Sequence, residues 1–315
     1  MLNSSCAIGD LEGIAAFSVN VLSALFGSFG NTLVCVTVYS SPRLHKTWCY
    51  FICSLSVADL LVNLCLQPME AILTLERMAG VCKHSLRDAF RLAAYITCGA
   101  SLMNLAFMSV ERLLAISWPF SQRQILTGRR TLITLAIIWG VPSFLGITGL
   151  VAGKGTRLSS LLILIGLAGC YGVILTSCVI LVLQTRAHFK VNNVMTLTET
   201  QFEIEHKNSA NLPSAGRVTE QRTALAITKK RRESKKRTAK TIGVVITVFT
   251  LSWVPYGYVL VSDPEQHVNS FYIWAVAIAM TNSAVNPVIY FFSSKDFRES
   301  SKRILCSTFR CWMTI

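Results

Sequence analysis

The feature that most constrains this chain is a series of seven apolar segments, each long enough to cross a lipid bilayer as a helix. A transmembrane helix takes about 20 predominantly apolar residues. The segments run over residues 14–39, 48–75, 89–117, 131–153, 158–185, 238–262 and 268–293. They lack the alternation of a barrel strand, and only helices and closed barrels satisfy their backbone inside a bilayer. We therefore predict an all-α bundle of seven transmembrane helices.

The composition excludes a soluble enzyme built around one core. Hydrophobic residues make up 52% of the 315 residues and charged residues 15%, against about 25% charged in an average globular domain. The mean hydropathy is +0.50. Most of the eleven cysteines lie inside apolar segments and none forms a CxxC pair, which argues against a zinc or dithiol redox site. The net charge of +14 is distributed as in a membrane protein, so we expect no nucleic-acid partner.

The basic residues predict how the chain is oriented in the membrane. If residues 1–13 form an extracellular N-terminus, 24 of the 30 Lys and Arg residues lie on the cytoplasmic side. Membrane proteins carry such an excess of Lys and Arg in their cytoplasmic loops. Within the membrane domain 14–293, residues 186–237 then form a basic third intracellular loop, and 294–315 a cytoplasmic tail. A glycosylation sequon at Asn3 agrees with an external N-terminus.

One carboxylate lies deep inside the predicted membrane region. Asp59 is about eleven residues into its segment, or roughly 16 Å at 1.5 Å per residue, which is close to the midplane. Ionisable residues at that depth are costly and usually functional. Candidate polar partners in other segments are Asn31, Ser101, Asn282, Ser283 and Asn286. Such a set of oxygen ligands suits a small hard cation; a protonated carboxyl held by one hydrogen bond is the alternative.

Two segments contain an internal proline that must interrupt the helical hydrogen bonds. Pro255 and Pro287 cannot donate to the carbonyls four residues earlier, so we expect a kink at each. Trp253 lies directly before the first kink and shares a helix face with Phe249. Phe249 and Trp253 therefore predict a hinge at the kink. The alternative is that the two aromatic side chains only pack against neighbouring helices.

Six motifs occur in a fixed order along these segments. They are Gly30-Asn31, Leu55-Ser56-Val57-Ala58-Asp59, Glu111-Arg112-Leu113, Trp139, Phe249-Thr250-Leu251-Ser252-Trp253-Val254-Pro255-Tyr256 and Asn286-Pro287-Val288-Ile289-Tyr290. With them the chain resembles a class A, rhodopsin-like G-protein-coupled receptor over nearly its full length. The resemblance implies a plasma-membrane signalling receptor that is not an enzyme and has no cofactor beyond an allosteric sodium ion.

The resemblance also implies a role for each motif residue. Asp59, Ser101, Asn282 and Asn286 would line a sodium pocket beneath Trp253. Arg112 would be held at rest by Glu111 and would meet a heterotrimeric G protein after an outward swing of the sixth helix, while Tyr290 rearranges. Arrestin and membrane lipid are further candidate partners. Residues 294–305 would form a short amphipathic eighth helix, followed by Cys306 and Cys311 as palmitoylation candidates, with free thiols as the alternative.

The chain departs from the family pattern at several places. Arg87 stands where the family has a cysteine above its third helix, so the usual external disulfide cannot form. Cys6 and Cys82 are candidates for a substitute bridge, with a free Cys82 as the alternative. Lys235 stands where an acidic residue often pairs with the motif arginine, and like charges there favour ligand-free activity.

The ligand is restricted mainly by what its pocket lacks. Ala94 replaces the aspartate of monoamine receptors, and Met280 replaces the lysine that retinal requires. Arg87 and Arg91 lie on one helix face and could clamp a carboxylate or phosphate; an Arg91–Glu70 ion pair is the alternative. An acidic lipid, a small carboxylate and a short peptide remain open. The predicted pocket residues are Gln67, Glu70, Arg87, Arg91, Ala94, Tyr95, Cys98 and Tyr256.

A membrane transporter is the alternative function. A transporter would also place an aspartate at the midplane, but it should show broken helices in a repeated pattern, which we do not find in the sequence.

Overall fold

The computed structural model describes residues 8–81, 84–118, 126–151, 165–166, 168–180, 183, 237, 240–259, 261–262 and 269–312. The described part of the chain contains helices and no strand. Six of its helices are long and apolar enough to cross a membrane. The fifth predicted segment, 158–185, is described mainly as the shorter apolar helix Ala168–Ile180; apart from residues 165–166 and 183, the rest of it lies outside the described ranges.

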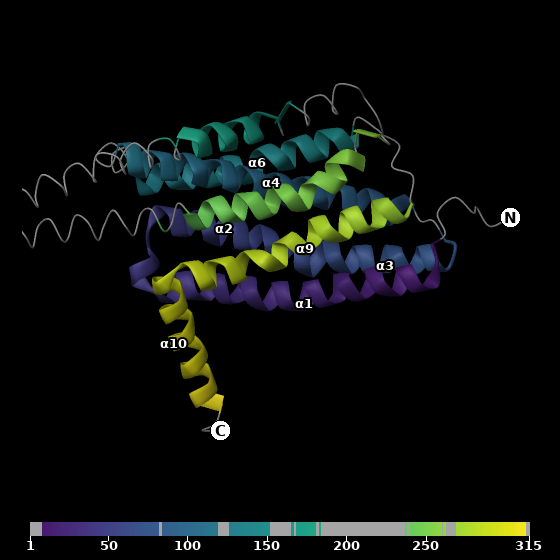
Figure 1. Cartoon of the computed structure of the whole chain (residues 1–315), viewed down its shortest axis with the longest axis horizontal. Helices are drawn as coiled ribbons and strands as arrows, with labels where there is room; N and C mark the ends of the chain where they lie inside the picture. Colours follow the sequence, from purple (N-terminus) through teal and green to yellow (C-terminus); the bar gives the residue numbers. More distant parts are fainter. Residues whose placement is uncertain are drawn as a thin grey trace, which may run out of the picture.

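The helices form a bundle with one helix projecting from it (Figure 1). The labelled elements are α1 (Asp10–Ser40), the 3-10 turn η1 (Pro42–Leu44), α2 (Thr47–Leu61), the π turn η2 (Val62–Leu66), α3 (Gln67–Met78), α4 (His84–Ser117), α6 (Gly128–Val151), α9 (Ser270–Ser293) and α10 (Lys295–Trp312). Between α6 and α9 lies the spanning helix Lys240–Val259. We call the end of the bundle where α1 begins the outer end, and the end where α10 begins the inner end.

Several helices extend beyond the predicted bounds. α1 begins at Asp10, four residues before the predicted start at 14, and α4 begins at His84 instead of residue 89. The second span is continuous over Thr47–Met78, because α2, η2 and α3 follow one another without a break. Most of the added residues are polar or charged, so hydropathy alone places them outside a span although the backbone remains helical.

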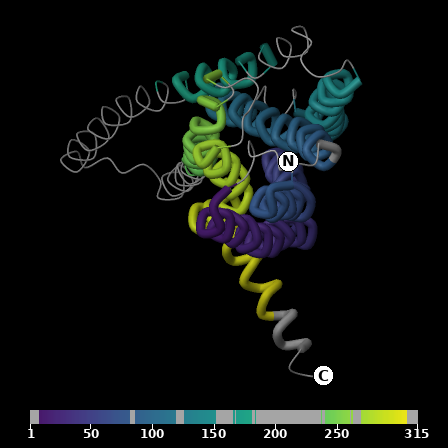
Figure 2. The backbone as a smooth tube through the Cα atoms, turned by 90° about the vertical axis from the view of Figure 1, so that its right-hand side faces the viewer, coloured from purple at the N-terminus to yellow at the C-terminus, as the bar shows by residue number. Residues whose placement is uncertain are grey.

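Helix α9 occupies a central position between α1 and the helix Lys240–Val259, as the end-on view shows (Figure 2). Its contact with α1 is close at Gly30, where an added Cβ would lie 2.9 Å from the ring of Pro287. Asn31 follows directly and donates a hydrogen bond of 2.9 Å to the carbonyl of Ser283. That carbonyl is the one that Pro287 leaves without its helical donor. Gly30 therefore allows the close approach of the two helices, and Asn31 satisfies the carbonyl that Pro287 leaves without a donor.

Two further prolines lie within the spans, in addition to the two predicted kink sites. Pro142 lies inside α6, and Pro68 lies in the first turn of α3. The π turn Val62–Leu66 directly precedes Pro68. A wider turn accommodates a residue that cannot donate its backbone hydrogen bond. The prediction that two helices carry such prolines was thus incomplete.

Helix α10 is held against the inner end of α1 by small polar contacts. Thr37 and Ser301 share a hydrogen bond of 3.1 Å, and Ser41 donates one of 2.9 Å to Ser300. Phe297 is buried against the ring of Tyr290, with the two centroids 6.4 Å apart. The helix runs to Trp312, beyond the expected end at 305.

Candidate functional site

The midplane carboxylate faces the interior of the bundle. Asp59 is 1% exposed and accepts a hydrogen bond of 2.7 Å from Nδ2 of Asn286. Beside it is a cavity of about 10 Å³, which is close to the least space that holds one water molecule. The cavity is lined by Asp59, Val62, Cys98, Ser101, Phe249, Trp253, Ala279, Met280, Asn282 and Ser283.

Several hydrogen-bond acceptors lie around this cavity. Besides the Asp59 carboxylate, the amide oxygens of Asn282 and Asn286 are buried and have no hydrogen-bond partner among the described residues. The hydroxyls of Ser101 and Ser283 also line the space. A carboxylate with amide and hydroxyl oxygens fits a hard monovalent cation, because such cations prefer oxygen ligands. The described residues contain no group of three or more His, Cys, Asp or Glu side chains suited to a transition metal.

An aromatic column on the helix Lys240–Val259 forms the wall of this cavity. Phe249 and Trp253 stack with centroids 5.7 Å apart, and Trp253 meets Tyr256 edge-on at 5.9 Å. The indole Nε1 of Trp253 is buried and has no partner in the described part of the chain. Within the described residues only packing holds the indole, so its ring can change position without breaking a hydrogen bond to any of them.

A buried ion pair lies near the inner end of α4. Arg112 is 5% exposed and contacts the carboxylate of Glu111 through two nitrogens, with Nη2 2.6 Å from Oε1. Its guanidinium also lies 5.5 Å from the ring centre of Trp48. Breaking one half of such a pair leaves a buried charge, which is strongly destabilising. The arginine is therefore stored in a covered position and not presented at the surface.

The outer half of the bundle differs from the predicted arrangement at Glu70. This carboxylate pairs with Arg77, at 2.5 Å, and both side chains are buried. α3 thus supplies a cation of its own two turns further along, and the suggested Arg91–Glu70 pair stays a prediction. The seven-residue spacing of Glu70 and Arg77 on one helix face was a signal that the sequence already contained. Arg77 is a site residue that sequence reasoning missed.

The other predicted pocket residues occupy different environments. Arg87, Arg91, Ala94 and Cys98 are partly buried, and the side chain of Tyr95 is 44% exposed. Gln67 is fully buried and donates to the carbonyl of Met280 on α9, at 3.2 Å. Tyr256 lies 6.5 Å, ring centre to ring centre, from Tyr272. Glu70 thus has Arg77 as its partner, and this ion pair neutralises the charge of Arg77.

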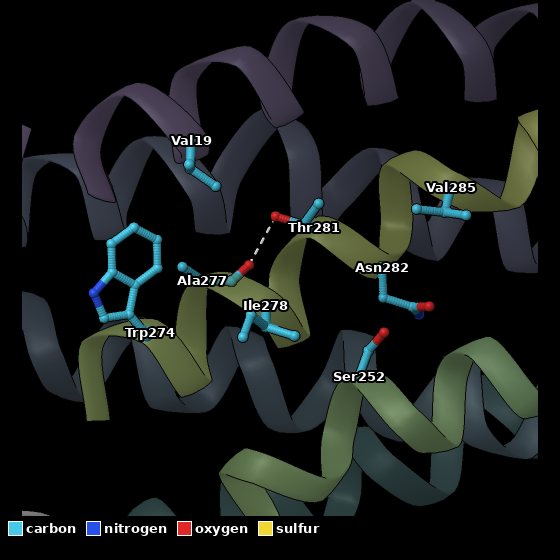
Figure 3. Close-up of a pocket in the computed structure, with 8 residues that line it drawn as sticks. All are labelled: Val19, Ser252, Trp274, Ala277, Ile278, Thr281, Asn282 and Val285. Atoms are coloured by element: carbon cyan, nitrogen blue, oxygen red, sulfur yellow. Dashed lines mark hydrogen bonds between the residues drawn. The ribbon is translucent and has the colours of Figure 1, made fainter. Parts of the chain in front are cut away.

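A second cavity, of about 250 Å³, opens on the side of the bundle between α1 and the helix Lys240–Val259 (Figure 3). Most of its lining is apolar, including Val19, Trp274 and Ile278. Its polar end is formed by Ser252 and Asn282, whose side chains point toward one another in the close-up. Asn282 lines both cavities, so it is the wall between the Asp59 cavity and this side opening.

Several predicted sites fall outside the described residues. They are the sequon at Asn3, the Cys6–Cys82 bridge and Lys235. The side chain of Cys311 is not described either, whereas Cys306 is exposed on α10 with a free thiol.

Comparison with known proteins gives a consistent picture. The family profile described as 7 transmembrane receptor (rhodopsin family) matches residues 30–290. The Alpha-1A adrenergic receptor of Oryzias latipes is 26% identical over 310 residues, covering 89% of this chain and 64% of the relative. The Alpha-1D adrenergic receptor of Rattus norvegicus is also 26% identical, over 96% of this chain and 60% of the relative. The chain thus spans somewhat less than two thirds of the length of these relatives.

A solved structure shows the same architecture. The crystal structure of squid rhodopsin superposes with a TM-score of 0.77 and covers 97% of this chain and 84% of that one. At 20% sequence identity this likeness shows the fold alone. Together with the family profile, it confirms the predicted all-α bundle of seven transmembrane helices.

Proposed function

Because the chain belongs to the rhodopsin family of seven-transmembrane receptors, we propose that it is a G-protein-coupled receptor of the plasma membrane. In this proposal an extracellular ligand binds in the outer half of the bundle. The helix Lys240–Val259 then swings outward at its inner end, and a heterotrimeric G protein binds there. The N-terminus faces the outside and the α10 end faces the cytoplasm, in line with the distribution of basic residues.

The observation that carries this proposal is the buried pair Glu111–Arg112 at the inner end of α4. An arginine that is always charged is expensive to bury, and its carboxylate partner lies on the adjacent residue instead of on a neighbouring helix. The pair therefore neutralises the arginine within one helix, while its guanidinium also lies against Trp48 of α2. It does keep a strong hydrogen-bond donor available for a partner that arrives at this end.

The proposal is tested by nucleotide exchange. Membranes containing the chain are incubated with a panel of purified G proteins and labelled GTP analogue. We expect exchange with at least one of them, and its loss in Arg112→Ala at equal surface expression. The variant Arg129→Ala is the control, because Arg129 is an exposed arginine at the start of α6. Equal exchange in Arg112→Ala and the wild-type chain would contradict the proposal.

We further propose that the Asp59 cavity binds sodium and favours the resting arrangement. The support is the set of acceptors there, namely the Asp59 carboxylate, which accepts one hydrogen bond from Asn286, and the amide oxygens of Asn282 and Asn286, which have no donor among the described residues. A cation there supplies positive charge that no described lysine or arginine provides in the cavity lining. Trp253 forms part of the same wall, which couples the occupant of the cavity to the helix Lys240–Val259.

For the ligand, we propose an anionic group in place of the monoamine that the names of the adrenergic relatives suggest. Ala94 offers no carboxylate for an amine. Around Glu70 the chain places Arg77 in contact, and Arg87 on the facing helix has its Nε buried without a partner in the described residues. Among these three side chains, two positive charges stand against one negative charge. An acidic lipid, a small carboxylate and an acidic peptide all fit this chemistry.

A further inference from the structure

Two cysteines on neighbouring helices meet near the inner end of the bundle. Cys35 lies on α1 and Cys53 lies on α2, and both thiols are free. The Cys35 thiol donates a hydrogen bond to the backbone carbonyl of Cys53, with 3.9 Å between sulfur and oxygen. A hydrogen bond also joins the two thiol groups themselves. We call these two residues the thiol pair.

The contacts of the thiol pair are those that a bridge between two helices requires. A disulfide forms only where two side chains point toward each other and their Cα atoms are about 4.4–6.8 Å apart. The hydrogen bond between the thiols meets the first requirement. The second is a matter of the gap between α1 and α2, and the Cys35 side chain alone reaches across this gap to the main chain of Cys53.

The position of the thiol pair distinguishes it from the other cysteines. Among the eight cysteines that the structure describes, only these two are hydrogen-bonded to another cysteine. Cys49 lies one turn before Cys53 but is buried in the core, whereas the thiol pair is only half-buried. Cys35 and Cys53 are five and six residues from the inner ends of their helices, or about 8 and 9 Å at 1.5 Å per residue. A small molecule at the inner end can therefore reach them.

We propose that the thiol pair is a redox modification site, at which hydrogen peroxide joins Cys35 and Cys53 in a disulfide between α1 and α2. In the first step one sulfur is oxidised to a sulfenic acid, and one water leaves. The second sulfur then attacks the first, and the hydroxyl group leaves with the remaining thiol proton as a second water. Two thiols and one peroxide thus give one disulfide and two waters. Hydrogen peroxide is small and uncharged, so it enters the edge of a bilayer more easily than a charged oxidant does.

The bridge would fasten the inner end of α1. It closes a loop over residues 35–53, which restricts the unfolded chain and so favours the folded one. The same end of α1 holds α10 through the hydrogen bonds of Thr37 with Ser301 and of Ser41 with Ser300. In the proposed orientation this end faces the cytoplasm, where thiols are normally kept reduced, so the bridge would form only under oxidising conditions. The oxidation of the thiol pair does not depend on coupling to a G protein.

The test identifies which cysteines become linked. The full chain in lipid nanodiscs is treated with hydrogen peroxide for increasing times, and catalase stops the reaction. The remaining thiols are alkylated in denaturant, and the unreduced protein is digested with chymotrypsin for mass spectrometry. Chymotrypsin cleaves after aromatic residues, and Tyr50 and Phe51 separate Cys49 from Cys53. Links to these two cysteines are therefore distinguished.

The variant Cys35→Ser removes one member of the thiol pair, and Cys306→Ser is the matched control, because it removes an exposed thiol on α10. The Tm of each protein is measured before oxidation, after oxidation, and after reduction with dithiothreitol. If Cys35→Ser does not yield a monodisperse protein, Cys53→Ser is measured by the same criteria.

We expect the Cys35–Cys53 peptide to accumulate about tenfold faster or more than any other linked peptide, because its second step takes place between neighbouring groups. The Tm should rise on oxidation and return on reduction in the wild-type chain and in Cys306→Ser, and it should not rise in Cys35→Ser. Absence of the Cys35–Cys53 peptide, or a Cys35–Cys49 peptide in its place, would overturn the modification site. Formation of the bridge without a rise in Tm would overturn its role in fastening α1.

Discussion

At the scale of single residues, the chain satisfies polar groups that its own prolines and carboxylates expose. Asn31 donates to the Ser283 carbonyl that Pro287 leaves free, and Asn286 donates to Asp59. In each case an amide on one helix serves a group on another. Because an unpaired buried polar group costs about 1–3 kcal/mol, these amides hold α1, α2 and α9 together at mid-membrane depth.

Sodium should stabilise the wild-type protein through Asp59. We expect the Tm of the purified chain to rise when potassium chloride is replaced by sodium chloride at equal ionic strength. In Asp59→Asn the rise should disappear, because the neutral amide offers no charge to the ion. Differential scanning fluorimetry with a thiol-independent dye measures both. A sodium-dependent rise that persists in Asp59→Asn would place the ion elsewhere.

Replacing Asn31 with leucine should destabilise the bundle. The substitution leaves the Ser283 carbonyl buried without its donor, at a cost of about 1–3 kcal/mol, so the Tm should fall. Asn20→Leu is a matched control, because Asn20 is buried on the same helix and donates only to Ala16 within α1. If the two variants lose the same Tm, the bond to Ser283 contributes nothing particular.

At the scale of helices, close approach depends on where glycine stands. Gly30 packs directly on Pro287 of α9, whereas Gly140 in α6 has no atom within 4 Å of the position that a Cβ would take. The same substitution should therefore have opposite consequences at the two positions. This difference follows from packing between helices, because both glycines lie inside regular helix.

Gly30→Ala should lower the Tm, because its Cβ would lie 2.9 Å from two atoms of the Pro287 ring and must push α1 away from α9. Gly140→Ala should leave the Tm unchanged or raise it, since alanine is the better helix former by about 1 kcal/mol in soluble proteins. Thermal unfolding of both variants in one detergent makes the comparison. A loss at Gly140 as large as that at Gly30 would show that backbone freedom, and not the α1–α9 contact, matters.

Hydropathy was sufficient to predict the spans, because a bilayer imposes one length on every crossing helix. It could not predict their ends, since α1 and α4 continue as helix into polar sequence at Asp10 and His84. The sequence analysis proposed Asn286 as a polar partner of Asp59, and the structure places the two side chains in contact. The Glu70–Arg77 pair was missed because pairing was sought between helices. Arg77 lies on the same helix as Glu70, where the spacing along the helix decides which side chains share a face.

At the scale of the whole molecule, the described contacts divide the bundle into a part joined by polar hydrogen bonds between helices and a part joined mainly by apolar packing. α1, α2, α3 and α9 share the hydrogen bonds of Asn31, Gln67 and Asn286. The helix Lys240–Val259 is joined to the cavity mainly through the rings of Phe249 and Trp253. Apolar ring contacts lack direction, so this helix can move relative to the others without leaving polar atoms exposed. The difference between the two parts gives the proposed outward swing its mechanical basis.

The outward swing is tested most directly by measuring the distance between the inner end of the helix Lys240–Val259 and the start of α6. Spin labels are attached through a ketone-bearing amino acid at positions 240 and 129, both exposed, which leaves the native cysteines unmodified. Double electron–electron resonance is recorded with and without nucleotide-free G protein, and a pair at positions 43 and 129 serves as the control. We expect that G protein populates a longer 129–240 distance while the 43–129 distance stays constant. An unchanged 129–240 distribution in a sample that demonstrably binds the G protein would contradict it.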